Sequence, residues 1–133
     1  IMTSCKIICL PKIEDPRGNL TFLQNQNQIP FNIQRVFWTY DVPGGERRGG
    51  HAYHKQEEFI IALSGSFDVV ITLPSDEKKV YTLNRSYYGL YLPPLTWRHM
   101  DNFSTNALSL HMSSTIFDSE DYIRDYKNYK EYL

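Results

Sequence analysis

Cysteine is scarce in this sequence, which contains only Cys5 and Cys9 among its 133 residues. Two cysteines are too few to build a disulfide framework, and these two lack the paired spacings of a structural zinc site. We therefore expect both to be free thiols in a reducing compartment.

The sequence also has no surplus of positive charge and no long apolar segment. Lysine and arginine together number 14, against 15 for aspartate and glutamate, so no basic excess is available to neutralise a nucleic-acid backbone. The longest apolar runs, such as residues 59–63, fall far short of the roughly 20 residues that a membrane-spanning helix needs. No basic segment followed by an apolar stretch marks a signal peptide. We expect a cytoplasmic protein that binds neither nucleic acid nor membrane.

Nothing in the sequence divides the chain into parts. Internal repeats, low-complexity tracts and linkers are all missing, and the length fits one domain. Hydrophobic residues make up 41% of the chain and aromatic residues 14%, which is enough to build an independent core. We expect a single domain over residues 1–133.

The local patterns are those of an all-β protein. Short segments rich in Val, Ile, Phe and Tyr alternate with Gly and Pro. The expected strands are residues 6–10, 19–23, 33–40, 58–63, 66–73, 79–83, 87–92 and 107–113. Between the fourth and fifth of these, Ser64-Gly65 predicts a two-residue hairpin turn.

The C-terminal segment has a different periodicity. Apolar and aromatic residues recur there at steps of three and four, with charged residues between them, which predicts an amphipathic helix that includes residues 122–133. Asp118 or Ser119 would cap its start. Many short strands with one terminal helix favour a barrel or a two-sheet jelly roll, whose mouth can hold a ligand.

Residues 45–65 contain the most informative pattern, together with a second short motif downstream. The spacing is defined by Gly45, His51, Tyr53, Glu58, Gly65, Pro94 and His99. It resembles the two motifs of the cupins, whose fold is a double-stranded β-helix or jelly-roll barrel. Residues two apart on a strand face the same side, so His51 and Tyr53 would both point into the barrel.

A closer resemblance covers about 120 residues, in matching order and spacing. Its motifs are Asp15-Pro16-Arg17-Gly18, Arg35-Val36, Arg48-Gly49-Gly50-His51-Ala52, Gly89-Leu90-Tyr91, Trp97, Asn102-Phe103-Ser104 and Asp121-Tyr122-Ile123-Arg124. They resemble the WxcM-like sugar-nucleotide 3,4-ketoisomerases, which are cupins without metal or redox cofactor. The resemblance implies an isomerase that converts a dTDP-4-keto-6-deoxyhexose to its 3-keto isomer in nucleotide-sugar biosynthesis. It also implies a homodimer with exchanged N-terminal strands.

Two positions depart from the ketoisomerase pattern. Where those enzymes have His-Ala-His, this sequence has His51-Ala52-Tyr53, and where they have Trp-His it has Trp97-Arg98-His99. We expect His51 to be the general base, because a neutral imidazole can remove the acidic proton beside a ketone. Tyr53 would return a proton, hold the enediolate oxygen, or only pack within the barrel.

The expected substrate-binding residues are Arg17, Arg48, Tyr91 and His99. The resemblance to the related 3,5-epimerases implies that Arg17 helps to hold the nucleotide diphosphate, often in a neighbouring subunit. Arg48 would bind diphosphate or sugar oxygens, for which an arginine fork is suited, although either arginine would also fit a solvated turn. Tyr91 and His99 would line the barrel, with Tyr91 stacking on thymine or packing, and Trp97 is expected to pack.

Two alternative functions remain open from the sequence. His51, Glu58 and His99 would supply two imidazoles and a carboxylate, as in a metal-dependent, oxygenase-type cupin. A cupin that binds a sugar nucleotide without catalysis is the other alternative. Bound metal would favour the first, and dTDP binding without proton exchange would favour the second.

Overall fold

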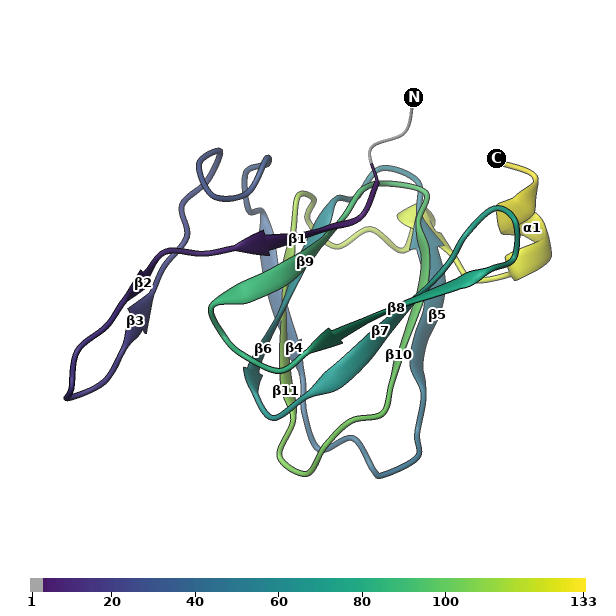
Figure 1. Cartoon of the computed structure of the whole chain (residues 1–133). Coiled ribbons are helices and arrows are strands. Elements are labelled where there is room, and N and C mark those ends of the chain that lie inside the picture. Colours follow the sequence, from purple (N-terminus) through teal and green to yellow (C-terminus); the bar gives the residue numbers. More distant parts are fainter. Residues whose placement is uncertain (1–3) are drawn as a thin grey trace.

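The computed structural model describes residues 4–133, which form two five-stranded antiparallel sheets packed face to face and a small projecting hairpin (Figure 1). In spatial order, the first sheet contains β1 (Lys6–Cys9), β9 (Tyr88–Leu92), β6 (Glu58–Ser64), β11 (Leu108–Ser113) and β4 (Arg35–Thr39). The second contains β12 (Tyr122–Ile123), β5 (Arg48–Tyr53), β10 (Trp97–Asp101), β7 (Phe67–Thr72) and β8 (Lys78–Leu83). The hairpin consists of β2 (Lys12–Ile13) and β3 (Leu20–Thr21). The predicted all-β cupin fold is confirmed, with two sheets that stay separate instead of closing into one barrel.

All eight strands predicted from the sequence are present, with shifted ends. The sequence missed β2, β10 and β12, and the composition of β5 gave no strand signal because Gly49 and Gly50 have low β-propensity. The pairing of β5 with β10 and β12 stabilises a strand that its own composition does not favour.

Gly65 was predicted to form a hairpin turn, and this prediction is wrong. β6 and β7 lie in different sheets and do not pair, so the turn carries the chain from one sheet to the other. Gly65 has φ of 66°, and a Cβ atom there would lie 2.5 Å from Ser104 Oγ and 2.8 Å from Ala107 Cα. The corner therefore requires glycine both for its backbone conformation and for the close approach of the neighbouring loop.

The predicted C-terminal helix over residues 122–133 is also partly wrong. Asp118 caps a short 3₁₀ turn, Ser119–Asp121, as expected for a cap, but the next two residues form β12. Only Tyr126–Lys130 is helical (α1), and its N-cap is Asp125. Ile123 pairs with Ala52 on β5 and is buried there. A solvated helix would not bury this side chain, so the pairing favours a strand at this position.

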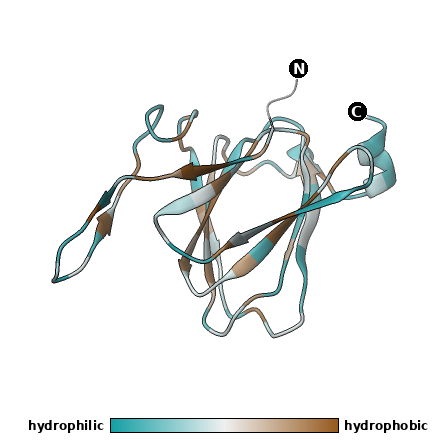
Figure 2. Ribbon diagram, viewed as in Figure 1, coloured by the Kyte–Doolittle hydropathy of each residue, from teal (hydrophilic) through white to brown (hydrophobic). Residues whose placement is uncertain are grey.

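The hydrophobic core has two main parts. One lies between the sheets and includes Phe67, Val69 and Leu90; the other covers the outer face of the first sheet, where Ile29 and Phe31 pack on Phe59. Apolar residues concentrate along the strands, whereas the C-terminal helix is mostly hydrophilic (Figure 2). No helix within residues 4–133 is long and apolar enough to cross a membrane.

Candidate active site

A pocket of about 360 Å³ lies between the two sheets and is lined by side chains of β4, β5, β6, β10, β11 and β12. Strand alternation decides which residues face it. On β5 these are residues 48, 49, 51 and 53, whereas Ala52 packs in a cluster with Ile123 and Tyr129. The predicted shared orientation of His51 and Tyr53 is therefore confirmed.

His51 lies in the wall of this pocket with both ring nitrogens unpartnered. Nδ1 and Nε2 are buried, and neither has a hydrogen-bond partner among the described residues. The imidazole makes an edge contact with Tyr53, with ring centroids 4.8 Å apart, and lies 5.4 Å from the Tyr122 ring. A β-bulge occurs beside it, where Gly49 has φ of 77° and a Cβ atom would come within 3.4 Å of the imidazole. The contact distance is ordinary, so the positive φ is what favours glycine at this position.

The surroundings of His51 keep its imidazole neutral. Burial, and next the positive charge of Arg98, lower the pKa of His51 to about 3. The ring is therefore uncharged at neutral pH, and one of its nitrogens keeps an unshared electron pair. No described residue forms a hydrogen bond with either nitrogen. A satisfied core histidine would have its nitrogens paired, and those of His51 have no partner among the described residues.

Tyr53 is 2% exposed and packs between the Tyr122 ring, 4.7 Å away, and the Arg98 guanidinium, 5.1 Å from its centroid. Burial, the negative charge of Glu58 and a hydrogen bond with Tyr122 all raise the pKa of Tyr53, against an opposing effect of Arg98. The phenol therefore stays protonated and can act as a donor in this pocket.

A buried charge cluster lies beside these two residues. Glu58 is 2% exposed, and its Oε1 accepts from Arg98 Nη1 at 3.2 Å and from Gln56 Nε2 at 3.0 Å. Its Oε2 pairs with His111 Nδ1 at 2.8 Å, and His111 Nε2 pairs with Ser109 Oγ at 2.8 Å. Burial alone would raise the pKa of Glu58, but Arg98 and then His111 outweigh it and lower the pKa to about 2. The carboxylate is thus ionised, and both of its oxygens are paired with neighbouring side chains.

Arg98 is the functional candidate that sequence analysis missed. It is 2% exposed, lies directly opposite His51 in the β5–β10 pairing and lines the pocket. Its Nε donates to the Thr96 carbonyl at 3.0 Å and its Nη1 to Glu58, but Nη2 is buried and has no partner within residues 4–133. A fixed cation with a free NH₂ group is suited to bind an oxygen of a ligand.

Polar and aromatic groups complete the mouth of the pocket. Arg48 and Arg124 are exposed and line it. Trp38, on the edge strand β4, lines the same mouth and is 58% exposed. Two arginines and an open indole give this end of the pocket the chemistry of an anion site next to a stacking surface.

Tyr91 and His99 do not line this pocket, and the expectation that they share its interior is wrong. Tyr91 faces the outer side of the first sheet, where it packs near Phe31 and donates a hydrogen bond to Glu57. His99 alternates with the inward-facing Arg98, so it points to the other side of β10 and pairs with Asp101 at 3.4 Å.

The orientation of His99 also removes the metal site that the sequence allowed. His51, Glu58 and His99 do not converge, and within residues 4–133 no group of three His, Cys, Asp or Glu side chains could hold a metal ion. Trp97 packs against Tyr126 and Tyr129, as predicted.

Arg17 lies at the end of the β2–β3 hairpin, which projects away from the two sheets (Figure 1). Its side chain is 90% exposed and is held by Asp15, which accepts from Nε at 3.0 Å and from Nη2 at 2.9 Å. It does not line the pocket of its own chain. Any contact between Arg17 and such a pocket would have to be with a second copy.

The fold and the pocket together define a cupin of the sugar-nucleotide isomerase and epimerase type. The dTDP-4-dehydrorhamnose 3,5-epimerase of Bacillus anthracis shares the fold with a TM-score of 0.75 at 16% identity, over 89% of this chain and 76% of that one. The family model described as FdtA: WxcM-like, C-terminal matches residues 3–133. The chain belongs to this FdtA/WxcM-like family.

Relatives of known activity resemble the chain over nearly its whole length. It is 37% identical over 128 residues to the TDP-4-oxo-6-deoxy-alpha-D-glucose-3,4-oxoisomerase of Aneurinibacillus thermoaerophilus, which covers 96% of this chain and 91% of the relative. The crystal structure of the sugar 3,4-ketoisomerase QdtA from Thermoanaerobacterium thermosaccharolyticum, in complex with TDP, has a TM-score of 0.93 at 35% identity, over 96% and 93% of the two chains. The TDP-quinovose 3,4-ketoisomerase WlaRB of Campylobacter jejuni has a TM-score of 0.90 at 36% identity, over 98% and 99%.

Proposed function

We propose that this protein is a 3,4-ketoisomerase of a TDP-linked 4-keto-6-deoxyhexose, acting in nucleotide-sugar biosynthesis. The observation that carries the proposal is the buried, neutral and unpartnered imidazole of His51 beside the free Nη2 of Arg98. The named activities of the full-length relatives support the choice of substrate.

His51 begins the proposed reaction by removing the hydrogen at C3 of the sugar. That hydrogen is acidic because C3 is bonded to the C4 ketone, and its loss places negative charge on the C4 oxygen. Arg98 Nη2, which has no partner of its own, donates a hydrogen bond to this oxygen as the charge develops. A preorganised donor of this kind lowers the barrier by a few kcal/mol.

The second half of the reaction returns a proton to C4. The enediolate loses its O3 proton and gains one at O4, so that C3 becomes the ketone and C4 the alcohol. The proton at C4 comes from Tyr53, His51 or solvent, and the neutral phenol of Tyr53 makes it a suitable donor. The electron pair stays within the sugar, so the conversion consumes no external oxidant or reductant.

The pocket mouth is proposed to hold the nucleotide. Arg48 and Arg124 would bind the diphosphate, since each can form paired hydrogen bonds with phosphate oxygens. The exposed Trp38 indole at the same edge would stack on thymine. Tyr91 and His99 are not part of this proposal, because both face away from the pocket.

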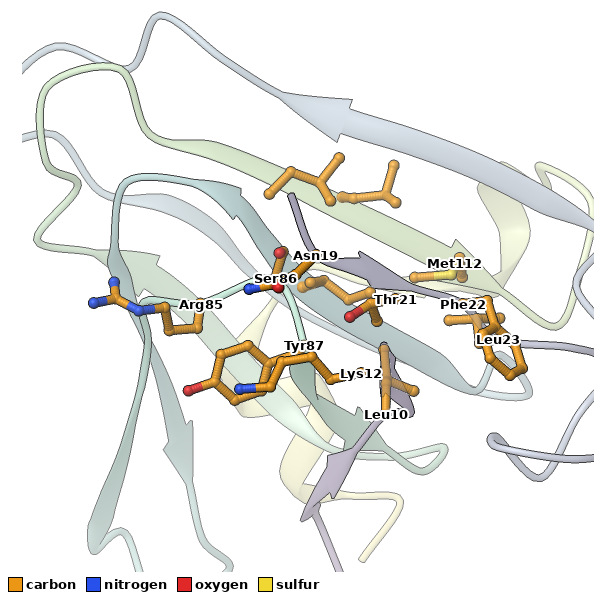
Figure 3. A pocket seen from close by; sticks show the side chains of 13 residues that line it. Leu10, Lys12, Asn19, Thr21, Phe22, Leu23, Arg85, Ser86, Tyr87 and Met112 are labelled. Atoms are coloured by element: carbon orange, nitrogen blue, oxygen red, sulfur yellow. The ribbon is translucent and has the colours of Figure 1, made fainter. Parts of the chain in front are cut away.

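A homodimer with exchanged N-terminal segments is the proposed assembly. A groove of about 640 Å³ lies between the hairpin and the outer face of the first sheet, and Figure 3 shows its apolar floor and the Lys12 chain lying along the Tyr87 ring. Leu63 in its lining is 45% exposed, and Ile13 and Leu20 on the hairpin are 56% and 55% exposed. A second copy seated here would cover this apolar surface and bring its own Arg17 toward the first copy's pocket. Because both cysteines are free thiols, the cytoplasm is the compartment we propose.

Identification of the product tests the proposed function. The protein, incubated with dTDP-4-keto-6-deoxyglucose, should yield the 3-keto isomer by NMR, and removal of tightly bound metal with a chelator should not change the rate. Tight TDP binding with an unchanged sugar would instead identify a non-catalytic binding protein. Loss of activity on chelation, restored by a divalent cation, would identify a metal-dependent cupin.

A further inference from the structure

Tyr122 occupies a fixed position beside Tyr53 that the proposed reaction leaves unused. It lies on the two-residue strand β12, directly opposite Tyr53 in the pairing with β5. The preceding residue, Asp121, secures this strand, because its carboxylate accepts from the backbone N–H groups of Lys55 at 2.9 Å and Gln56 at 3.1 Å. The backbone of Tyr122 is therefore held by Asp121 and by the pairing with β5.

Tyr53 and Tyr122 form a path from the buried part of the pocket to its mouth. Tyr53 is 2% exposed, and the part of it that is accessible faces the pocket. Tyr122 is half-buried, lines the same pocket, and its ring centroid is 4.7 Å from that of Tyr53. The exposed Arg124 places its guanidinium 4.3 Å from the Tyr122 centroid. Exposure thus increases step by step along these three side chains.

A buried phenol that gives a proton to C4 must regain one before the next turnover. The phenolate left on Tyr53 would be strongly disfavoured, because burial and the nearby charge of Glu58 raise the pKa of Tyr53. Tyr122 is the neighbouring phenol that can hydrogen-bond with Tyr53, and the Arg124 guanidinium lies over its ring.

We propose that Tyr122 passes protons from solvent to Tyr53, so that the two tyrosines form a relay supplying the hydrogen at C4. The inference rests on the proposed isomerase function. Tyr122 acts through Tyr53: its O–H bond breaks as the Tyr53 O–H bond forms, and water then reprotonates Tyr122 at the mouth. The proton that His51 takes from C3 leaves to solvent separately, so the protein is restored after each cycle.

The source of the C4 hydrogen tests this relay. dTDP-4-keto-6-deoxyglucose carrying deuterium at C3 is incubated in ordinary water, and two rates are followed by NMR: loss of the C3 label from substrate and formation of isomerised product. The variants are Tyr122→Phe, which keeps the ring, and Arg124→Gln, which keeps both phenols. Tyr126→Phe is the matched control, since Tyr126 donates to Asp76 outside the pocket. TDP affinity by calorimetry confirms that each variant is folded and binds.

The relay predicts that wild-type product carries ordinary hydrogen at C4. In Tyr122→Phe, the rate of isomerisation should fall by about tenfold, while the rate of C3 label loss stays within about twofold of the wild-type rate. In Arg124→Gln, the ratio of isomerisation to label loss should fall as well, but by less. Tyr126→Phe should leave both rates unchanged. Deuterium carried from C3 to C4, or an unchanged ratio of the two rates in Tyr122→Phe, would overturn the relay. A wild-type protein that neither loses label nor isomerises the sugar would reject the proposed function, and the relay with it.

Discussion

The charge cluster beneath His51 makes a specific prediction about stability. Replacing Glu58 by Gln would leave Arg98 charged, 2% exposed and without its ion-pair partner. Removing one member of a buried pair typically costs about 3–5 kcal/mol, because the other charge remains buried. The fall in the pKa of Glu58 from 4.5 to about 2 corresponds to about 3 kcal/mol, in agreement with that range.

Urea and thermal unfolding at pH 7 measure the effect of Glu58→Gln. For a chain of this length, a loss of about 3 kcal/mol should lower the melting temperature by roughly 10 °C. The folded pKa is below the unfolded one, so the contribution is complete above about pH 4.5 and is lost as the pH falls toward 2. The difference between wild type and variant should therefore shrink on acidification.

Two further variants make this prediction refutable. Glu14 pairs with Lys12 at 3.2 Å with its side chain 72% exposed, and Glu14→Gln should have little effect, as is usual for surface pairs. Replacing both Glu58 and Arg98 by Met should recover much of the loss, since no uncompensated charge remains. A loss of less than about 1 kcal/mol in the free energy of unfolding of Glu58→Gln would refute the reasoning. A double Met variant that loses as much as the two single Met variants added together would also refute it.

Three other predictions concern His51 and Arg17. Because the pKa of His51 is about 3, kcat/KM should stay level from pH 8 to pH 5, and an acid limb near pH 6.5 would contradict its burial. Because the unfolded state takes up a proton at His51 near pH 6.5 and the folded state only near pH 3, the free energy of unfolding of wild type should fall between these pH values. His51→Asn lacks this group, so from pH 7 to pH 5 its free energy of unfolding in urea should fall by about 2 kcal/mol less than that of wild type. If Arg17 acts across a dimer, inactive Arg17→Ala and His51→Asn chains, unfolded and refolded together, should regain activity through one intact site per mixed dimer. No recovery would place Arg17 outside the partner's site.

The positions of most strands along the chain were predictable, because β-branched and aromatic segments separated by turn residues leave a clear pattern. What local pattern could not supply was pairing. The segment with Tyr122 and Ile123 fits a helical periodicity equally well, and only the partner strand β5 makes it extended. The corner at Gly65 looked like a hairpin for the same reason, since the sheet to which each strand belongs is decided by distant contacts.

The site was predicted where alternation within one strand was enough. His51 and Tyr53 are two residues apart, and both reached the pocket as expected. The same rule, applied to residues 97–101 with apolar Met100 facing inward, would have placed Arg98 inward and His99 outward. The motif spacing favoured His99 instead, and a buried arginine was not foreseen because its counter-ion Glu58 lies 40 residues away in the sequence.

The removal of the C3 proton by His51 is the central claim, and deuterium exchange tests it most directly. Wild type and His51→Asn are incubated with dTDP-4-keto-6-deoxyglucose in deuterated water, and the C3 signal is followed by NMR at matched TDP occupancy. We predict deuterium at C3 with the wild type and an exchange rate lower by about 10²–10⁴ in the variant, the usual contribution of a positioned base. Exchange at an undiminished rate in His51→Asn would contradict the account.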